Sequence, residues 1–231
     1  MKLYKHFVIT RFNIRIHYGC KLKNPEDNPM DRILDEDYLE ERFYIFEKYT
    51  FPSMKNQNNK DFTWIILFHK KTPDKFKKRI ERLKHEFNFV DLYLDDGEKF
   101  SFLEYCDNYE KDIEYFLTTR IDNDDMINEE YISKIQEYAD KNFHQCVISF
   151  EKGIKYDLYS QKKFEYIRKD NHFLSMIGPR EECILQYNHA KILDSGKEMV
   201  FLNSDLYMWT EIIHDSNVIN KVKKEDTENE I

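Results

Sequence analysis

Glycine is scarce in this chain, with five residues in 231, and none of them begins a Gly-Lys-Ser or Gly-Lys-Thr sequence. A P-loop needs that sequence at the end of a glycine-rich turn, so P-loop nucleotide hydrolases are excluded. Nucleotidyltransferases are disfavoured for a related reason, because the glycine-rich, lysine-containing phosphate loop expected after the first strand is missing. Phosphate binding by a glycine-rich loop is therefore not expected.

Closely spaced cysteines and long apolar runs are also missing. The four cysteines form no C-x-x-C pair, which argues against a zinc ribbon or a dithiol redox motif and favours free thiols in a reducing compartment. The sequence has neither about 18 consecutive apolar residues nor the pattern of a secretory signal peptide at its amino terminus. We expect a soluble cytoplasmic protein that touches membranes peripherally at most.

Positive charge is in deficit, since the formal net charge is −8 and the sequence pI is about 5.6. Proteins that bind nucleic acid generally neutralise many phosphates with Lys and Arg, so we expect no nucleic-acid partner. The basic segment 75–79 is interpreted as the solvated face of a helix.

What the first 150 residues do contain is an alternation of apolar runs with segments of helical periodicity. The clearest helix start is Thr72-Pro73-Asp74, which offers a cap, a proline for the first turn and an early acid. The alternation predicts an α/β fold with a mostly parallel central sheet flanked by helices, and ligands that bind beyond the carboxyl ends of its strands. The predicted strands are 7–9, 63–68, 89–94, 113–121 and 147–150, and the predicted helices start near 35, 73 and 128.

The pattern changes after Gly153 to short stretches with polar interruptions. They predict antiparallel strands or covering loops, and so a mixed or antiparallel C-terminal part of the same single domain, which we place at 1–220. The charged segment 221–231 is expected to be a flexible tail. The short stretches are 156–159, 164–168, 184–187 and 199–202.

A cluster of charged residues, Arg120 to Asp125, follows the predicted strand 113–121. Neighbouring carboxylates repel one another, so they indicate either a divalent cation or a solvated loop. An EF-hand is excluded, because Met126 and Ile127 stand where it needs a further ligand and a glycine. Asp122 and Asp124 form an Asp-x-Asp element that can hold Mg²⁺ or Mn²⁺ against the diphosphate of a nucleotide sugar. The element is short, and Asp35-Glu36-Asp37 also matches it.

The order and spacing of several blocks resemble the putative rhamnosyltransferase family of glycosyltransferases over nearly the whole chain. The strongest block is Thr119-Arg120-Ile121-Asp122-Asn123-Asp124-Asp125. The others are His6 to Asn13, Phe51-Pro52-Ser53 with Gln57, Asp61 to Trp64, Thr72-Pro73, Phe150 to Gly153, Phe173-Leu174-Ser175 and Trp209 through His214 to Asn217.

The resemblance implies a GT-A-type fold with a nucleotide-sugar-binding half at 1–150 and an acceptor-side half at 151–220. It implies a metal-dependent glycosyltransferase that moves a sugar from a nucleoside-diphosphate sugar to a hydroxyl of a glycan or polysaccharide precursor, with Mn²⁺ or Mg²⁺ as cofactor. The implied metal ligands are Asp122, Asp124 and His214, with His189 as the second choice of histidine. The implied donor-binding residues are Thr10, Arg11, Gln57, Arg120 and Asp122.

The chain departs from the family pattern near the expected catalytic base. An inverting transfer needs a carboxylate that takes the proton of the acceptor hydroxyl. Family members often carry an acid soon after the Phe-x-Ser block, but here Gly178 follows, and the candidates are Glu181 and Glu182. This departure keeps an alternative open, namely a catalytically inactive protein of the same fold that acts as a binding or scaffold partner. The arginines could likewise simply pair with carboxylates, and His214 and Gln57 could be structural.

Overall fold

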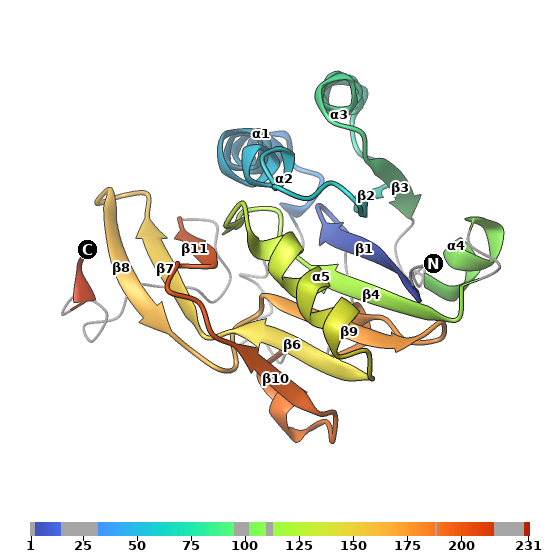
Figure 1. The fold of residues 1–231 in the computed structure, drawn as a ribbon. Helices are drawn as coiled ribbons and strands as arrows, with labels where there is room; N and C mark the ends of the chain where they lie inside the picture. Colours follow the sequence, from blue (N-terminus) through green and yellow to red (C-terminus); the bar gives the residue numbers. More distant parts are fainter. Residues whose placement is uncertain (1–2, 15–31, 95–101, 110–112, 188, 215–228) are drawn as a thin grey trace.

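The computed structural model describes residues 3–14, 32–94, 102–109, 113–187, 189–214 and 229–231. Its centre is a seven-stranded sheet in the order β10-β6-β9-β4-β1-β2-β3 (Figure 1). All neighbouring strands pair in parallel except those beside β9, which runs antiparallel to both β4 and β6. The strands are β1 (Tyr4–Arg11), β2 (Thr63–His69), β3 (Val90–Leu94), β4 (Tyr115–Arg120), β6 (Cys146–Phe150), β9 (Leu174–Pro179) and β10 (Met199–Leu202).

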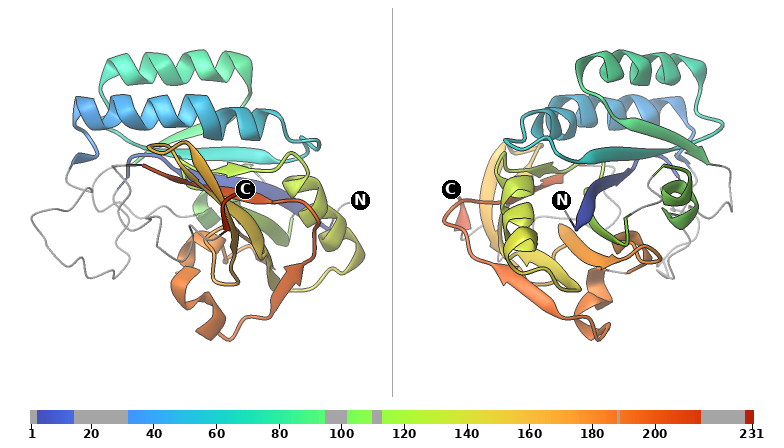
Figure 2. Two further views of the ribbon diagram at one scale, coloured as in Figure 1. Left: turned by 90° about the vertical axis from the view of Figure 1, so that its left-hand side faces the viewer. Right: turned by 45° about the vertical axis from the view of Figure 1, so that its right-hand side comes forward.

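Helices cover both faces of this sheet, as the two views of Figure 2 show. On one face, apolar side chains of α1, α3 and α5 pack on alternate residues of the strands, including Val8, Ile66 and Leu117. On the other face, α4 and the segment after β9 cover Phe7, Ile9 and their neighbours. The helices are α1 (Glu36–Ile45), α2 (Phe51–Lys55), α3 (Asp74–Glu86), α4 (Phe102–Tyr109) and α5 (Tyr131–Lys141); a π-helical turn, η3 (Phe46–Thr50), joins α1 to α2.

A second, four-stranded sheet lies beside the first, in the order β5-β11-β7-β8 (Figure 1). Its β11 pairs in parallel with β7 and antiparallel with β5, which brings the chain around residue 213 back to the loop after β4. The small sheet thus closes over the carboxyl end of the large one. Its strands are β5 (Met126–Ile127), β7 (Lys152–Asp157), β8 (Lys162–Ile167) and β11 (Trp209–Ile213).

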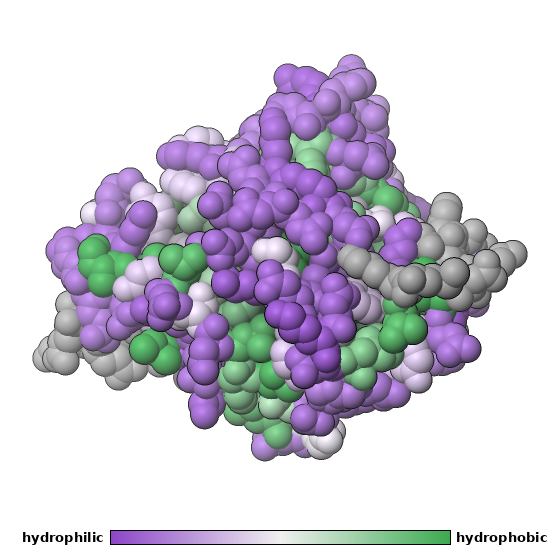
Figure 3. Space-filling view, viewed as in Figure 1, coloured by the Kyte–Doolittle hydropathy of each residue, from purple (hydrophilic) through white to green (hydrophobic). Residues whose placement is uncertain are grey.

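The α/β class, the mostly parallel central sheet and the mixed C-terminal part are confirmed. The two sheets interleave along the sequence, since the large sheet takes β9 and β10 from beyond residue 150 and the small sheet takes β5 from before it. Hydrophilic residues cover the upper part of the surface in Figure 3, and hydrophobic residues show through mainly in its lower part, around β6 and β10.

The structure adds local detail to these predictions and corrects one of them. Pro73 rather than Thr72 is the N-cap of α3, because the Thr72 hydroxyl donates to the carbonyl of His69 instead. Segment 184–187, expected as a strand or a covering loop, forms a 3₁₀ turn, η4 (Ile184–Gln186), since the amide of Gln186 bonds back to Cys183. Strands β9 and β11 were not predicted from the periodicity. Most of the expected tail, 221–228, lies outside the described residues.

Candidate active site

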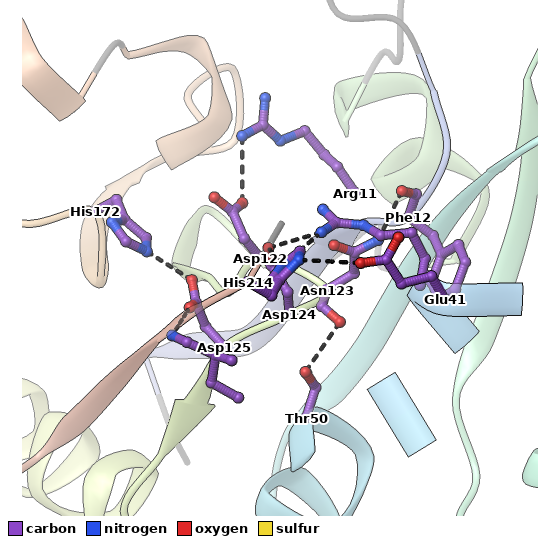
Figure 4. A network of polar contacts seen from close by, with 12 residues as sticks. Arg11, Phe12, Glu41, Thr50, Asp122, Asn123, Asp124, Asp125, His172 and His214 are labelled. Atoms are coloured by element: carbon purple, nitrogen blue, oxygen red, sulfur yellow. Dashed lines mark hydrogen bonds and ion pairs between the residues drawn. The ribbon is translucent and has the colours of Figure 1, made fainter. Parts of the chain in front are cut away.

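The carboxylate cluster lies in the loop between β4 and β5, at the carboxyl ends of β1 and β4. Its middle residue fixes the loop: the Asn123 side chain donates to the carbonyl of Phe12 (2.8 Å), and its own carbonyl accepts from the Thr50 hydroxyl (3.0 Å). These bonds tie the loop to the end of β1 and to η3. The three aspartates around Asn123 consequently point to different partners (Figure 4).

Asp122 is held by two arginines, each the last residue of a parallel strand. Arg120 donates to both of its carboxylate oxygens (3.1 and 3.0 Å), and Arg11 donates to one of them (3.2 Å). Burial by itself raises the pKa of Asp122, but the two guanidinium groups outweigh it and hold that pKa well below its ordinary value. Asp122 therefore stays ionised between two cations at the sheet edge.

Asp124 meets a histidine and a third arginine. Its Oδ2 lies 2.9 Å from His214 Nε2 and 2.9 Å from Arg42 Nη1. His214 Nε2 and Arg42 Nη1 are themselves 3.0 Å apart. Burial raises the pKa of Asp124, yet the Arg42 guanidinium and the His214 contact lower it to about 2. Glu41 lies beyond the ring, with Oε1 3.6 Å from His214 Nδ1.

Asp125 has a different environment. One oxygen lies 2.7 Å from His172 Nε2, and the other accepts the backbone N–H of Ile212 in β11 (3.0 Å). Burial raises the pKa of Asp125 to about 7, and the adjacent carboxylate raises the pKa of His172 to about 9 against the effect of burial. The pair retains its protons to a higher pH than isolated side chains would, and it links the loop to the strand that precedes His214.

Two groups of side chains at this loop offer donor atoms of the kind that hold a divalent cation, and the first is the Asp124–His214 pair. An octahedral ion bound at about 2.1 Å places adjacent ligand atoms about 3.0 Å apart. Asp124 Oδ2 and His214 Nε2 are 2.9 Å apart, a hydrogen-bond distance in this structure that is also close to the spacing of adjacent metal ligands. Arg42 shares the same oxygen, so a bound ion must share or replace its contact. Asp122, Asp125 and His172 also offer one atom each within 4.8 Å of one another, but Arg11 and Arg120 already compensate Asp122.

The structure thus brings together five of the predicted site residues, namely Arg11, Arg120, Asp122, Asp124 and His214. Thr10 and Gln57 lie elsewhere. Thr10 is fully buried in β1, and its hydroxyl accepts the indole N–H of Trp64.

Gln57 has a structural position. Its amide donates to the carbonyls of Ser53 and Asn128, and its oxygen accepts the N–H of Ile132 at the start of α5. Together they tie the turn after α2 to the segment that leads into α5. They leave the amide no free donor for a nucleotide, which argues against the predicted donor contact.

Glu181 and Glu182 are placed far from the carboxylate loop. Strand β9 pairs antiparallel with β4, so that Ser175 faces Thr119 near the loop and Pro179 faces Tyr115 at the other end of the strand. Four residues of strand separate these positions, or about 13 Å. Glu182 lies beside Gly178, whose register partner is Phe116 near the far end, and it is paired with Lys197. A base must reach the reacting hydroxyl directly or through one water, so this placement argues against the role predicted for them. The side chain of His189, the second choice of ligand, lies outside what the structure describes.

Arg42 and His172 are the site residues that the sequence did not reveal. Arg42 lies within a helix whose predicted apolar face did not include it, and nothing in its neighbours marks a site. His172 directly precedes the Phe173-Leu174-Ser175 block and stacks on Phe173, with ring centroids 4.4 Å apart. That block was the available signal for His172.

The mostly parallel sheet, with carboxylates, arginines and a histidine at its carboxyl edge, places the chain among the α/β proteins, which generally bind their ligands at that edge. The family described as "Putative rhamnosyl transferase" matches residues 5–226. The chain belongs to this family, which confirms the resemblance stated above.

Solved structures show weaker similarities. TarS 1–349 of S. aureus has 12% identity and a TM-score of 0.48, with 90% of this chain and 60% of that chain covered. The same protein in complex with UDP-GlcNAc has 13% identity and a TM-score of 0.47, with 91% of this chain and 59% of that chain covered. A putative nucleotide-diphospho-sugar transferase from Desulfovibrio desulfuricans G20 has 10% identity and a TM-score of 0.40, with 87% of this chain and 80% of that chain covered. The chain thus spans about 60% of the TarS 1–349 chain. No curated protein matches the sequence.

Within the described part of the chain, no helix has both the length and the apolar character needed to cross a bilayer.

Proposed function

We propose that the protein is a metal-dependent glycosyltransferase of the GT-A type, which moves a sugar from a nucleoside-diphosphate sugar to a hydroxyl of a glycan or polysaccharide precursor. Family membership supports the class of reaction. The observation that carries the proposal is the 2.9 Å approach of Asp124 and His214, which are 90 residues apart in sequence and come from the ends of two different sheets.

Mn²⁺ or Mg²⁺ at this pair would supply a Lewis acid for the charge that develops on the departing nucleoside diphosphate. Asp124 and His214 hold the ion in this proposal. Asp122 accepts from Arg11 and Arg120, whose guanidinium groups match phosphate oxygens as well as they match a carboxylate. The two arginines therefore orient the donor diphosphate at the ends of β1 and β4.

A second candidate function is a binding or scaffold protein of the same fold. The contact that favours it is the ion pair of Arg42 with Asp124, at 2.9 Å, because this cation already compensates the carboxylate that a metal would need. The two candidates differ in one property. A transferase binds its donor more tightly when the metal is present, whereas a scaffold with Arg42 as its permanent cation shows no such linkage.

Thermal shift with a panel of nucleoside-diphosphate sugars, each with and without Mn²⁺, tests the proposal. Ligands that bind the folded state raise its apparent stability, so at least one donor should raise the Tm more with Mn²⁺ than without it. Slow hydrolysis of the same donor should also require the metal. Asp124→Asn should remove both effects, while the control Glu137→Gln, an exposed acid on α5, should retain them. Equal shifts with and without metal for every donor would exclude the transferase.

A further inference from the structure

Aromatic and basic side chains gather where α1 and η3 meet the β7–β8 hairpin. Lys48 Nζ lies between two rings, 5.3 Å from the centroid of Tyr44 and 5.1 Å from that of Tyr49. Tyr49 packs edge-on against Tyr156 of β7, with centroids 6.1 Å apart. Lys163 of β8, the cross-strand partner of Tyr156, lies 5.5 Å over the Tyr156 ring. We call these five residues the tyrosine–lysine surface.

The tyrosine–lysine surface is exposed and carries two lysines. Tyr44 is 55% exposed, and both lysines are exposed. Among the residues that the structure describes, neither Lys48 nor Lys163 has a carboxylate partner, whereas the neighbouring Lys162 is paired with Glu230. Lys48 donates to the Tyr44 hydroxyl (3.0 Å), so in a chain with a net charge of −8 the two lysines place positive charge beside the tyrosine rings of this surface.

The surface adjoins the candidate active site through both of its elements. Lys48 follows Arg42 by six residues, which is about 9 Å along the helix axis at about 1.5 Å per residue. Tyr156 is the register partner of Ile212 in β11, and side chains two residues apart in a strand share a face, so His214 emerges on the same side of the small sheet as Tyr156. That side packs against the helix that carries Glu41 and Arg42.

We infer that the tyrosine–lysine surface binds an anionic glycan chain and guides its hydroxyl end to the site at Asp124 and His214. The inference rests on the proposed function and adds to it the chemical class of the acceptor. Tyrosine rings offer apolar faces for pyranose rings together with hydroxyl groups for hydrogen bonds, and the lysines select carboxylate or phosphate substituents. The rings are already ordered by their contacts with each other and with the lysines, which lowers the entropic cost of binding.

An anionic membrane is the other polyanion that such a surface could meet, and the observations favour the glycan. Stable attachment to lipid takes a cluster of four to eight basic residues or an inserted apolar face. The tyrosine–lysine surface has two lysines, and its rings pack against each other edge-on instead of projecting together.

Binding of an oligogalacturonate, measured by calorimetry and saturation-transfer NMR, tests the inference. Its methyl ester serves as the uncharged match, and vesicles of phosphatidylglycerol serve as the membrane probe. The double variant K48Q/K163Q is compared with K78Q/K141Q, which removes the same charge from exposed positions of α3 and α5. We expect the wild type and K78Q/K141Q to bind oligogalacturonate more tightly than its ester. K48Q/K163Q should bind oligogalacturonate at least fivefold more weakly than the wild type does. Tyr156→Leu should weaken the binding of both sugars.

Each of three results would overturn the inference: no binding of either sugar by the wild type, equal binding by the two double variants, or binding to the vesicles and not to the sugar. The metal-linked donor shift, measured on the same samples, separates this test from that of the proposed function. Sugar binding without a donor shift supports the surface and contradicts the transferase. A donor shift that is retained in K48Q/K163Q while sugar binding is lost supports both.

Discussion

Two consecutive aspartates in one loop, Asp124 and Asp125, each contact a histidine and yet have opposite properties. The first lies 2.9 Å from His214, and its pKa falls to about 2. The second lies 2.7 Å from His172, and its pKa rises to about 7. Both carboxylates are buried, so burial alone does not separate them.

The difference comes from the third partner. Arg42 places a permanent cation beside Asp124, which stabilises the ionised carboxylate. The described partners of the Asp125 side chain are a histidine and the amide of Ile212, and the neighbouring carboxylates raise its pKa further. Asp124, an ionised carboxylate, has the charge that a metal ligand needs. Asp125 and His172 retain their protons to higher pH, and their contacts connect the loop to β11 instead. The two aspartates should therefore respond differently to the same substitution.

The largest expected effect is on turnover. Asp124→Asn removes the anionic ligand oxygen and should lower glycosyl transfer or donor hydrolysis at least 100-fold, about 3 kcal/mol at about 1.4 kcal/mol for each factor of ten. Asp125→Asn keeps an oxygen for the Ile212 amide and should retain more than a tenth of the wild-type rate. Steady-state rates at saturating Mn²⁺ measure both. Equal losses in the two variants would show that the aspartates share one role.

A smaller effect, on the order of 2 kcal/mol, should appear in the pH dependence of stability. The pKa of His172 is raised from 6.5 to about 9, so the stabilisation from its pairing is complete below pH 6.5 and is lost as the pH rises through about 9. Urea unfolding of the wild type and of His172→Asn should therefore differ most near pH 6 and converge by pH 10. A difference that is constant across this range would contradict the raised pKa of His172.

The smallest expected effect concerns Glu41, whose side chain is 41% exposed beside His214. Partly exposed ion pairs contribute about 0 to 1 kcal/mol, so Glu41→Gln should weaken Mn²⁺ binding threefold or less and leave the fold unchanged. Calorimetric titration with Mn²⁺ measures the change. A tenfold loss would mean that Glu41 is itself a ligand and that the Asp124–His214 pair is incomplete without it.

The strands and the position of the carboxylate loop at the sheet edge could be predicted, because both follow from short stretches of sequence. Apolar runs such as 63–68 and 147–150 correspond closely to β2 and β6, and parallel connectivity places the ends of β1 and β4 at one edge. Strand β11 escaped prediction because its order comes from pairing with β5 and β7, which are distant in sequence.

The partners of the aspartates could not be predicted, for a physical reason. Asp124 and Asp125 are adjacent and identical in type, and what distinguishes them is which long-range side chain arrives, Arg42 from α1 or His172 from the turn before β9. The motif located the carboxylates, and family resemblance added His214. Likewise, the role of Gln57 depends on three backbone groups that the fold brings together, and the position of Glu181 and Glu182 depends on the direction of β9.

Titration of Mn²⁺ followed by electron paramagnetic resonance, in which the ion loses its free signal on binding, is the most direct measurement of the central claim. The wild type and Asp125→Asn should bind one Mn²⁺ with affinities within a few-fold of each other, while Asp124→Asn and His214→Ala should each bind at least tenfold more weakly. Tight binding that survives the loss of Asp124 or His214 but not of Asp125 would place the ion on the other pair and contradict the account.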